Sequence, residues 1–333
     1  MRAQIIEAFG GPEVFQLKDV PDPTPGPSQV LIRQQGSSVN PVDYKLRSDG
    51  RDIAPEFPGI LGFDVSGIVT AIGPDVTDFA VGDAVYGAAG GVKGQGGAYA
   101  ELIAAETRVI AKRPSNISPV EAAAMPLVTI TAWEGLERAG LSESRGAEKT
   151  VLVRGGTGGV GHIAIQLAKA WGAEVTASVS GDDKAKIARD LGADHIINYR
   201  DEDWDEAVAK LTDGAGFDIV FDGTGGDQLD PAFSAARLNG HVVALVSLFT
   251  HDLSLLHARG LSLHLVFMPL NLLAGIGGAE HQRILTGATA LVEAGKLKPL
   301  IDDQRFTLET VPEAQTHAEN GRPLGKVVIA IAD

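Results

Sequence analysis

Residues 150–184 read TVLVRGGTGGVGHIAIQLAKAWGAEVTASVSGDDK and join an apolar run, a glycine-rich turn and a helical pattern. The apolar run at residues 151–154 predicts a strand, and the spacing G-x-G-x-x-G follows at Gly156, Gly158 and Gly161. Glycines let a backbone turn tightly and approach a pyrophosphate, and the N-terminus of the next helix offers unpaired N–H groups. We therefore predict a dinucleotide-binding strand, turn and helix. The alternative is a glycine-rich turn that binds no ligand.

The same pattern continues toward the C-terminus. The short apolar runs VLVR, EVTASV, DHIINY, FDIVFD, HVVALV and LSLHLVF alternate with helical stretches, which predicts a doubly wound parallel sheet. Before it, runs such as QVLIRQQGSSV and VSGIVTAIG are broken by Pro and Gly and indicate a β-rich region. The run GKVVIAIAD is similar to that region, so we expect the parallel sheet to be an insertion. The predicted β-rich domain comprises residues 1–122 and 270–333, and the nucleotide domain residues 123–269.

Composition excludes several classes of protein. A chain of 333 residues is too long for one core. It contains no cysteine, which excludes disulfides, thiolate nucleophiles and cysteine-ligated zinc. A net charge of -15 argues against nucleic-acid partners. No apolar run is long enough to span a membrane, and the opening MRAQIIEAFGGPEVF lacks the features of a secretion signal, so we expect a cytoplasmic protein.

The end of the second nucleotide-domain strand indicates which dinucleotide is bound. The strand ends in ASVSGDDK, which puts two serines where a carboxylate would bind the ribose of NADH and repel a 2′-phosphate. Asp182 and Asp183 come later and fit the N-cap and first turn of the next helix. NADPH is therefore favoured over NADH. The side chains expected at its phosphate are Ser178, Ser180, Lys184 and Tyr199.

Several motifs occur together in one order: SSVNPVDYKLR, GFDVSGIVTAIGPDVTDFAVGDAVYG, AAAMPLVTITAWEGL, GGTGGVGHIAIQLAKAWGA and GADHIINYRDED. In this the chain resembles the medium-chain dehydrogenase/reductase superfamily, and within it the zinc-independent quinone oxidoreductases related to zeta-crystallin. The resemblance covers nearly the whole chain. It implies an α/β fold in which a GroES-like β-rich catalytic domain is interrupted by a Rossmann doubly wound parallel sheet.

The resemblance also bears on metal binding. The alcohol dehydrogenases of the superfamily hold a catalytic zinc with a Cys in the first motif and a His-Glu pair in the second. This chain has Asn40 and Asp43 in the first motif and Phe63 and Asp64 in the second. Where those relatives have a structural zinc lobe, it has the loop GAAGGVKGQGG, which we expect to be a surface connection. We therefore expect no metal site.

Without a metal, another group must stabilise the negative charge that develops on a conjugated oxygen when hydride arrives. Lys45 is our candidate, because its ammonium stabilises such charge and can give up a proton. The same segment supplies Asn40, Asp43 and Tyr44, which the resemblance places at the active site. NPVDYK looks more like the alkenal and enone reductases than like zeta-crystallin's nearest relatives, which carry Tyr at that position. The alternative is that Lys45 is a solvated surface lysine.

The expected function is NADPH-dependent hydride transfer to quinones or α,β-unsaturated carbonyl compounds without zinc. Thr131 matches a position near the nicotinamide, and residues at the carboxyl ends of parallel strands line the ligand crevice. Asp222 and Thr224 fit this rule or form a turn, and Gly325 and Lys326 match a segment that can reach the cofactor. The expected cofactor contacts are Thr131, Gly156, Thr157, Gly158, Gly159, Val160, Ser178, Ser180, Lys184, Tyr199, Gly223, Ser247, Leu248, Phe267 and Met268.

Two other functions stay open. Proteins of this kind also serve as NADPH-binding sensors or structural proteins with little turnover, and a zinc-free alcohol dehydrogenase is the third possibility. The strand LSLHLVF should be the last of its sheet, and an open sheet edge needs to be covered. The resemblance implies a homodimer formed by pairing such edges. The partners expected are thus a small electrophile and a second copy, with no nucleic acid and no membrane.

Overall fold

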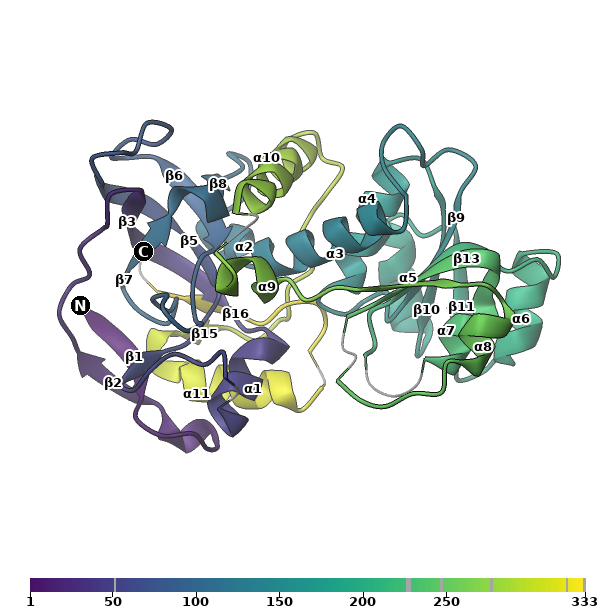
Figure 1. Cartoon of the computed structure of the whole chain (residues 1–333), viewed down its shortest axis with the longest axis horizontal. Helices are drawn as coiled ribbons and strands as arrows, with labels where there is room; N and C mark the ends of the chain where they lie inside the picture. Colours follow the sequence, from purple (N-terminus) through teal and green to yellow (C-terminus); the bar gives the residue numbers. More distant parts are fainter. Residues whose placement is uncertain (51, 226–228, 246–247, 276–277, 322, 332–333) are drawn as a thin grey trace. The chain divides into compact units, whose positions relative to one another are not determined.

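Helix α3 (Pro126–Arg138) carries the chain from the first of two units of the computed structural model into the second (Figure 1). The structure describes residues 1–50, 52–225, 229–245, 248–275, 278–321 and 323–331. The first unit comprises Met1–Ile130, Pro269–Gly295 and Pro299–Asp333, and the second comprises Thr131–Met268 and Lys296–Lys298. The division between the two units lies within α3, between residues 130 and 131, whereas we predicted a domain limit between residues 122 and 123. As limits of independently folding domains, the predicted boundaries stay predictions.

Among its described residues, the first unit contains two β-sheets. The smaller has the order β2 (Gln16–Asp19), β1 (Arg2–Ile6), β4 (Gly59–Ile60). The larger has the order β15 (Phe306–Thr307), β16 (Val328–Ala330), β3 (Gln29–Ser38), β5 (Asp64–Ile72), β6 (Ala84–Ala88), β8 (Ile110–Lys112), and β7 (Leu102–Glu106) also pairs with β3. Strand β3 is long enough to pair with β7 along its first half and with β16 along its second half. Alternate apolar side chains of β3 and β5 form the core, for example Val30, Ile32, Val65 and Val69.

In the part of this unit that the structure describes, five helices belong wholly to it: α1 (Pro41–Asp49), α2 (Pro119–Ala123), α9 (Pro269–Leu273), α10 (Gly278–Glu293) and α11 (Val311–Glu319). Short 3₁₀ turns lie at Pro12–Val14, Thr107–Val109 and Leu308–Thr310. Helix α1 directly follows β3 and lies beside α11 (Figure 1). The loop at residues 87–97, expected on the surface, is only partly there, since residues 88–92 are buried while Lys93, Gly94 and Gly96 are exposed.

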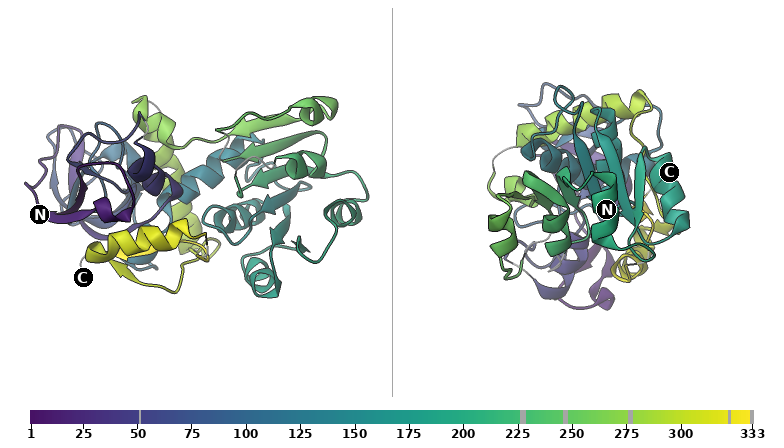
Figure 2. Two further views of the ribbon diagram at one scale, coloured as in Figure 1. Left: turned by 90° about the horizontal axis from the view of Figure 1, so that it is seen from below. Right: turned by 90° about the vertical axis from the view of Figure 1, so that its right-hand side faces the viewer.

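The second unit contains the predicted doubly wound parallel sheet. Its six strands, all parallel, have the order β11 (His195–Asn198), β10 (Glu174–Val179), β9 (Thr150–Arg154), β12 (Phe217–Asp222), β13 (Ala236–Ala244), β14 (Ser262–Leu265). Five further helices, α4 (Gly161–Ala170), α5 (Asp182–Asp190), α6 (Trp204–Leu211), α7 (Asp230–Ala235) and α8 (Ser254–Ala258), connect these strands, which run side by side in Figure 2. The strand order reverses between β9 and β12, the point at which such sheets bind ligands. Strand β14 is at the edge, as predicted.

Candidate active site

A buried carboxylate lies at the centre of a polar cluster in the first unit. Asp64 begins β5 and is 0% exposed. Its Oδ2 accepts hydrogen bonds from Ser38 Oγ at 2.6 Å and Asn40 Nδ2 at 2.7 Å. Its Oδ1 accepts one from the backbone N–H of Leu127, in the first turn of α3, at 2.8 Å. A charged group without water needs several donors, and here the end of β3, the start of α1 and the start of α3 supply them.

Lys326 completes this cluster. Its side chain is 3% exposed, and its ammonium donates to Asn40 Oδ1 and to Val39 O and lies 3.5 Å from Asp64 Oδ2. The residue sits just before β16, where the backbone pairs with the end of β3. Burial lowers the pKa of the Lys326 ammonium, while the carboxylates of Asp64 and Asp43 act in the opposite direction. Sequence reasoning had placed Lys326 only as a possible cofactor contact, whereas the structure places it against Asn40.

Asn40 and Asp43 set the start of α1. Asn40 is the extended N-cap residue, and its backbone N–H donates to Asp43 Oδ2 at 2.7 Å. The hydroxyl of Tyr99 donates to the same oxygen at 3.1 Å. The pKa of Asp43 is raised to about 7, chiefly by burial and also by the nearby Asp64 charge, against the lowering effect of the Asn40 N–H, Lys326 and the Tyr99 hydroxyl. Both predicted residues are 0% exposed and are brought together, with Asp64, inside the unit.

The other two predicted catalytic residues lie further along α1. Tyr44 and Lys45 are half-buried, and burial raises the pKa of the Tyr44 hydroxyl. The next turn carries Arg47, which is 2% exposed. Its guanidinium donates to Gly10 O, to Gln315 Oε1 and, with two bonds, to the carboxylate of Glu319 on α11. Helix α1 is therefore fixed at both ends, with Lys45 between them. A half-buried lysine can pack its stem and keep its ammonium in water, so both readings of Lys45 stay predictions.

The glycine-rich turn of the second unit follows β9 as predicted. Gly155 has a φ of +72°, and Gly158 N donates to Gly155 O at 2.9 Å, which closes the turn before α4 begins at Gly161. A Cβ at Gly161 would lie 2.2 Å from Gly155 O, so no other residue fits there without a backbone shift. Such a turn fits a pyrophosphate, because its backbone N–H groups and the N-terminus of the ten-residue helix α4 lie close together. Of the other predicted turn residues, Thr157 is buried and Gly159 and Val160 are half-buried.

Of the residues predicted at the 2′-phosphate, Ser178 and Ser180 lie at the carboxyl end of β10, Tyr199 directly follows β11, and Lys184 lies in the first turn of α5. Ser178 is 2% exposed, and its carbonyl accepts from Gly156 N. Ser180 is half-buried, while Lys184 and Tyr199 are exposed. Asp182 and Asp183 were predicted at the N-cap and first turn of α5. The N-cap is Gly181 instead, but both aspartates occupy the first turn, where a negative charge interacts favourably with the helix dipole.

The remaining predicted contacts differ in exposure. Gly223 N donates to Arg154 O at the end of β12, while Leu248 and Phe267 are 77% and 47% exposed. Met268 and Thr131 are buried. Ser247 lies outside the described residues.

Sequence reasoning missed an ion pair beside the glycine-rich turn. Arg154 Nη1 donates to Asp222 Oδ2 at 2.9 Å, and Asp222 Oδ1 accepts from the N–H and hydroxyl of Thr224. Asp222 and Thr224 thus form the turn that was the alternative to a cofactor contact. The signal was available, because VLVR and FDIVFD end in opposite charges and run next to each other in the predicted sheet.

Within the described ranges, no three His, Cys, Asp or Glu side chains are grouped so that they could hold a metal ion. Over the same residues, no helix is both long and apolar enough to cross a bilayer.

Comparisons with known proteins agree with this architecture. Residues 26–115 match the alcohol dehydrogenase GroES-like domain, and residues 159–269 match the zinc-binding dehydrogenase family. A 2-methylene-furan-3-one reductase of Solanum lycopersicum is 35% identical over 99% of this chain and 79% of its own length. A chloroplastic NADPH-dependent alkenal/one oxidoreductase of Arabidopsis thaliana is 33% identical with the same coverage.

Two solved structures are similar over the whole chain. An alcohol dehydrogenase superfamily protein from Novosphingobium aromaticivorans has a TM-score of 0.93 and 38% identity, with all of both chains covered. A quinone oxidoreductase of Escherichia coli complexed with NADPH has a TM-score of 0.85 and 26% identity, with 99% of this chain and 100% of that chain covered. These matches confirm the predicted fold class, a GroES-like domain interrupted by a Rossmann sheet.

Proposed function

We propose that this chain, a member of the medium-chain dehydrogenase/reductase superfamily, reduces quinones or α,β-unsaturated carbonyl compounds with NADPH and without zinc. Within the superfamily it belongs to the group of quinone and enone oxidoreductases. The chain is an oxidoreductase of this family. Quinones, alkenals, enones and methylene-furanones all carry a C=C bond conjugated to a carbonyl. The observation that carries the proposal is the turn from Gly155 to Gly161, which offers a pyrophosphate cradle at the strand-order switch.

The preference for NADPH rests on the strand end at Ser178. No carboxylate follows β10 until the first turn of α5, and the exposed Lys184 and Tyr199 are available to a 2′-phosphate. In the proposed site Lys184 supplies the positive charge, while Ser180 supplies a hydroxyl donor. NADPH should therefore bind more tightly than NADH.

In the reaction, the bound reduced nicotinamide would supply a hydride to the electrophilic carbon of the substrate. Negative charge then develops on the conjugated oxygen, and the ammonium of Lys45 stabilises it. The same ammonium can pass a proton to the enolate or phenolate and regain one from solvent. Asn40 and Asp43, predicted as catalytic, are assigned here to holding α1, because both are fully buried.

The proposal that no zinc takes part rests on the residues of the Asp64 cluster. Asp64 and Asn40 are the polar residues at the two motif positions where zinc-dependent relatives carry ligands. The Lys326 ammonium donates a hydrogen bond to Asn40 Oδ1 and lies 3.5 Å from Asp64 Oδ2. A positive charge at this place repels a divalent cation.

The test is NADPH oxidation by metal-stripped protein with 1,4-benzoquinone, 9,10-phenanthrenequinone, methyl vinyl ketone and a simple aldehyde. We expect turnover of quinones or enones, no gain on adding Zn²⁺, and a loss of about 100-fold or more in kcat for Lys45→Ala. Turnover of the aldehyde alone would favour the alcohol dehydrogenase alternative. Tight NADPH binding without any turnover would favour the sensor or structural alternative.

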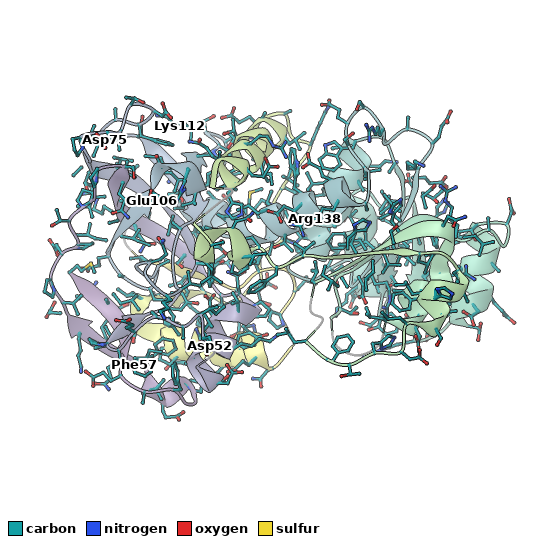
Figure 3. All side chains as sticks on the ribbon, in the orientation of Figure 1. Asp52, Phe57, Asp75, Glu106, Lys112 and Arg138 are labelled. Atoms are coloured by element: carbon teal, nitrogen blue, oxygen red, sulfur yellow. The ribbon has the colours of Figure 1, made fainter. Side chains whose placement is uncertain are left out.

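We also propose a homodimer formed through β14. Leu265 on this edge strand is 51% exposed, and Phe267 just beyond it is 47% exposed. Arg138, labelled in Figure 3, donates to Leu265 O and holds the end of the strand in place. Exposed apolar side chains on an open edge favour pairing with a second copy. The cytoplasmic location stays a prediction, since the relative from Arabidopsis thaliana is named as chloroplastic.

A further inference from the structure

We propose that the buried ion pair of Asp64 and Lys326 is a positioning device for catalysis, which fixes Asn40 and through it the helix that presents Lys45. The inference rests on the proposed function, in which Lys45 faces the developing negative charge. Neither Asp64 nor Lys326 needs to touch substrate in this role.

The side-chain amide of Asn40 has only one possible orientation between these two groups. Its Nδ2 donates to Asp64 Oδ2 at 2.7 Å, and its Oδ1 accepts from Lys326 Nζ. A carboxylate can only accept and an ammonium can only donate, so a reversed amide would lose both bonds. Asn40 is the N-cap of α1, so this fixed amide determines where the helix starts.

The carboxylate of Asp64 joins segments that are far apart in sequence. Besides Asn40 and Lys326, it receives Ser38 Oγ from the end of β3 and Leu127 N from the start of α3. The carboxylate and the ammonium are almost fully buried, so water cannot replace a lost partner. In a buried hydrogen-bond network of this kind, removal of one member also weakens the remaining hydrogen bonds.

Lys45 lies five residues after Asn40 on the nine-residue helix α1. The far end of the helix is held by Arg47 and its bonds to Gln315 and Glu319. With the Arg47 end fixed, loss of the Asn40 bonds would let the helix tilt and displace Lys45. A misplacement of about 1 Å can lower a rate by about 100-fold.

Stability alone does not account for this ion pair. Two charges taken out of water gain little over well-packed apolar side chains of the same size. A pair that contributes little to folding but fixes one amide orientation and one helix start is suited to a role in geometry.

The experiment is a double-mutant cycle of Lys45→Ala and Lys326→Met, with kcat measured at saturating NADPH and methyl vinyl ketone or benzoquinone. If Lys326 acts by positioning Lys45, Lys326→Met lowers kcat by about 10- to 100-fold in the wild-type background and by less than about threefold in the Lys45→Ala background. Equal losses in both backgrounds, or no loss, would overturn the proposal. A Lys45→Ala variant with full activity would instead overturn the proposed role of Lys45.

A second comparison separates positioning from folding. The double variant Asp64→Asn/Lys326→Met removes both charges of the pair, so it should be more stable to urea than Lys326→Met, yet its kcat should stay low. Recovery of kcat together with stability would show a purely structural role and would overturn the proposal.

The control is Lys18→Met, which breaks an exposed lysine–carboxylate pair with Glu7 and should leave kcat and stability unchanged. If Lys326→Met does not fold, Ser38→Ala removes one donor of the network with little change in volume. In the same cycle Ser38→Ala should show a smaller loss of kcat that again depends on Lys45, and a loss independent of Lys45 would count against the proposal.

Discussion

A single carboxyl group, Asp43, shows how burial changes the chemistry of a residue in this molecule. In the unfolded chain it titrates near 3.8, and in the folded protein at about 7, because it is buried and lies near Asp64. Between these pH values the folded state holds a proton that the unfolded state has released. The contribution of Asp43 to the free energy of unfolding is therefore fully present below pH 3.8, and it is lost as the pH rises through about 7.

Asp43→Asn should remove this pH dependence. A carboxamide oxygen in the place of Oδ2 can still accept from Asn40 N and from the Tyr99 hydroxyl. Relative to the variant, the wild type should lose up to about 1.4 kcal/mol of unfolding free energy per pH unit between about pH 5 and about pH 7. Urea unfolding at several pH values checks this, with the exposed Asp52→Asn (Figure 3) as the matched control. A wild-type slope no steeper than that of Asp43→Asn would contradict the pKa assigned to Asp43.

At the residue scale, sequence patterns located the glycines of the nucleotide turn and the segment Asn40–Lys45, because each has a local spacing. They did not show that Asn40, Asp64 and Lys326 meet. That contact depends on β16 pairing with the end of β3, between residues almost three hundred positions apart in sequence. A charge beside a buried strand, as in GFDV and GKVV, is the only local sign of such a partner.

At the scale of elements, the position of helix α1 is fixed more by the hydrogen bonds of side chains at its two ends than by the packing of an apolar face. Of its nine residues, Asp43, Leu46 and Arg47 are buried, and two of these are charged. A helix held in this way should be sensitive to the loss of Arg47.

Arg47→Met should lower the free energy of unfolding by about 3 kcal/mol, because it leaves Glu319 and Gln315 without their partner. The matched control is Arg283→Met on α10, which breaks an arginine–glutamate pair whose side chains are 47% and 43% exposed. That variant should lose less than about 1 kcal/mol. Urea unfolding of both variants measures the difference, and equal losses would show that α1 does not depend on the buried arginine.

The nucleotide turn makes a separate prediction. Gly161→Ala should cost about 1 to 3 kcal/mol of stability and weaken NADPH binding, because its Cβ would lie 2.2 Å from Gly155 O. Gly181→Ala, with no atom within 4 Å of its Cβ and an extended backbone, should lose less than about 1 kcal/mol, the cost of alanine in place of an N-cap glycine. Fluorescence titration and urea unfolding give both quantities. A stable Gly161→Ala that binds NADPH normally would refute the close-approach argument.

The elements themselves were predictable where their pattern is strong. The six apolar runs of the nucleotide unit became its six strands. The boundary inside α3 was not predictable, because an apolar helix that continues from one unit into the other has no composition change at the crossing.

At the scale of the whole molecule, the proposed dimer can be tested at one edge. Leu265→Asp places a charge on β14 and should convert a dimer into a monomer in sedimentation velocity, because a buried charge at a strand pair costs several kcal/mol. Leu17→Asp, on β2 of the other unit and 39% exposed, should leave the dimer intact. A wild type that sediments as a monomer would remove the basis for the edge pairing.

The pairing of β16 with β3 also sets the order in which the two units can fold during synthesis. A ribosome makes residue 326 after every strand of the parallel sheet has been made, while Asp64 and Asn40 have long emerged. The nucleotide unit can thus fold while the chain is still growing, whereas the ammonium that completes the Asp64 cluster arrives later. During that interval the nascent polypeptide holds a carboxylate without its counter-charge, so binding of dinucleotide should become possible before turnover does.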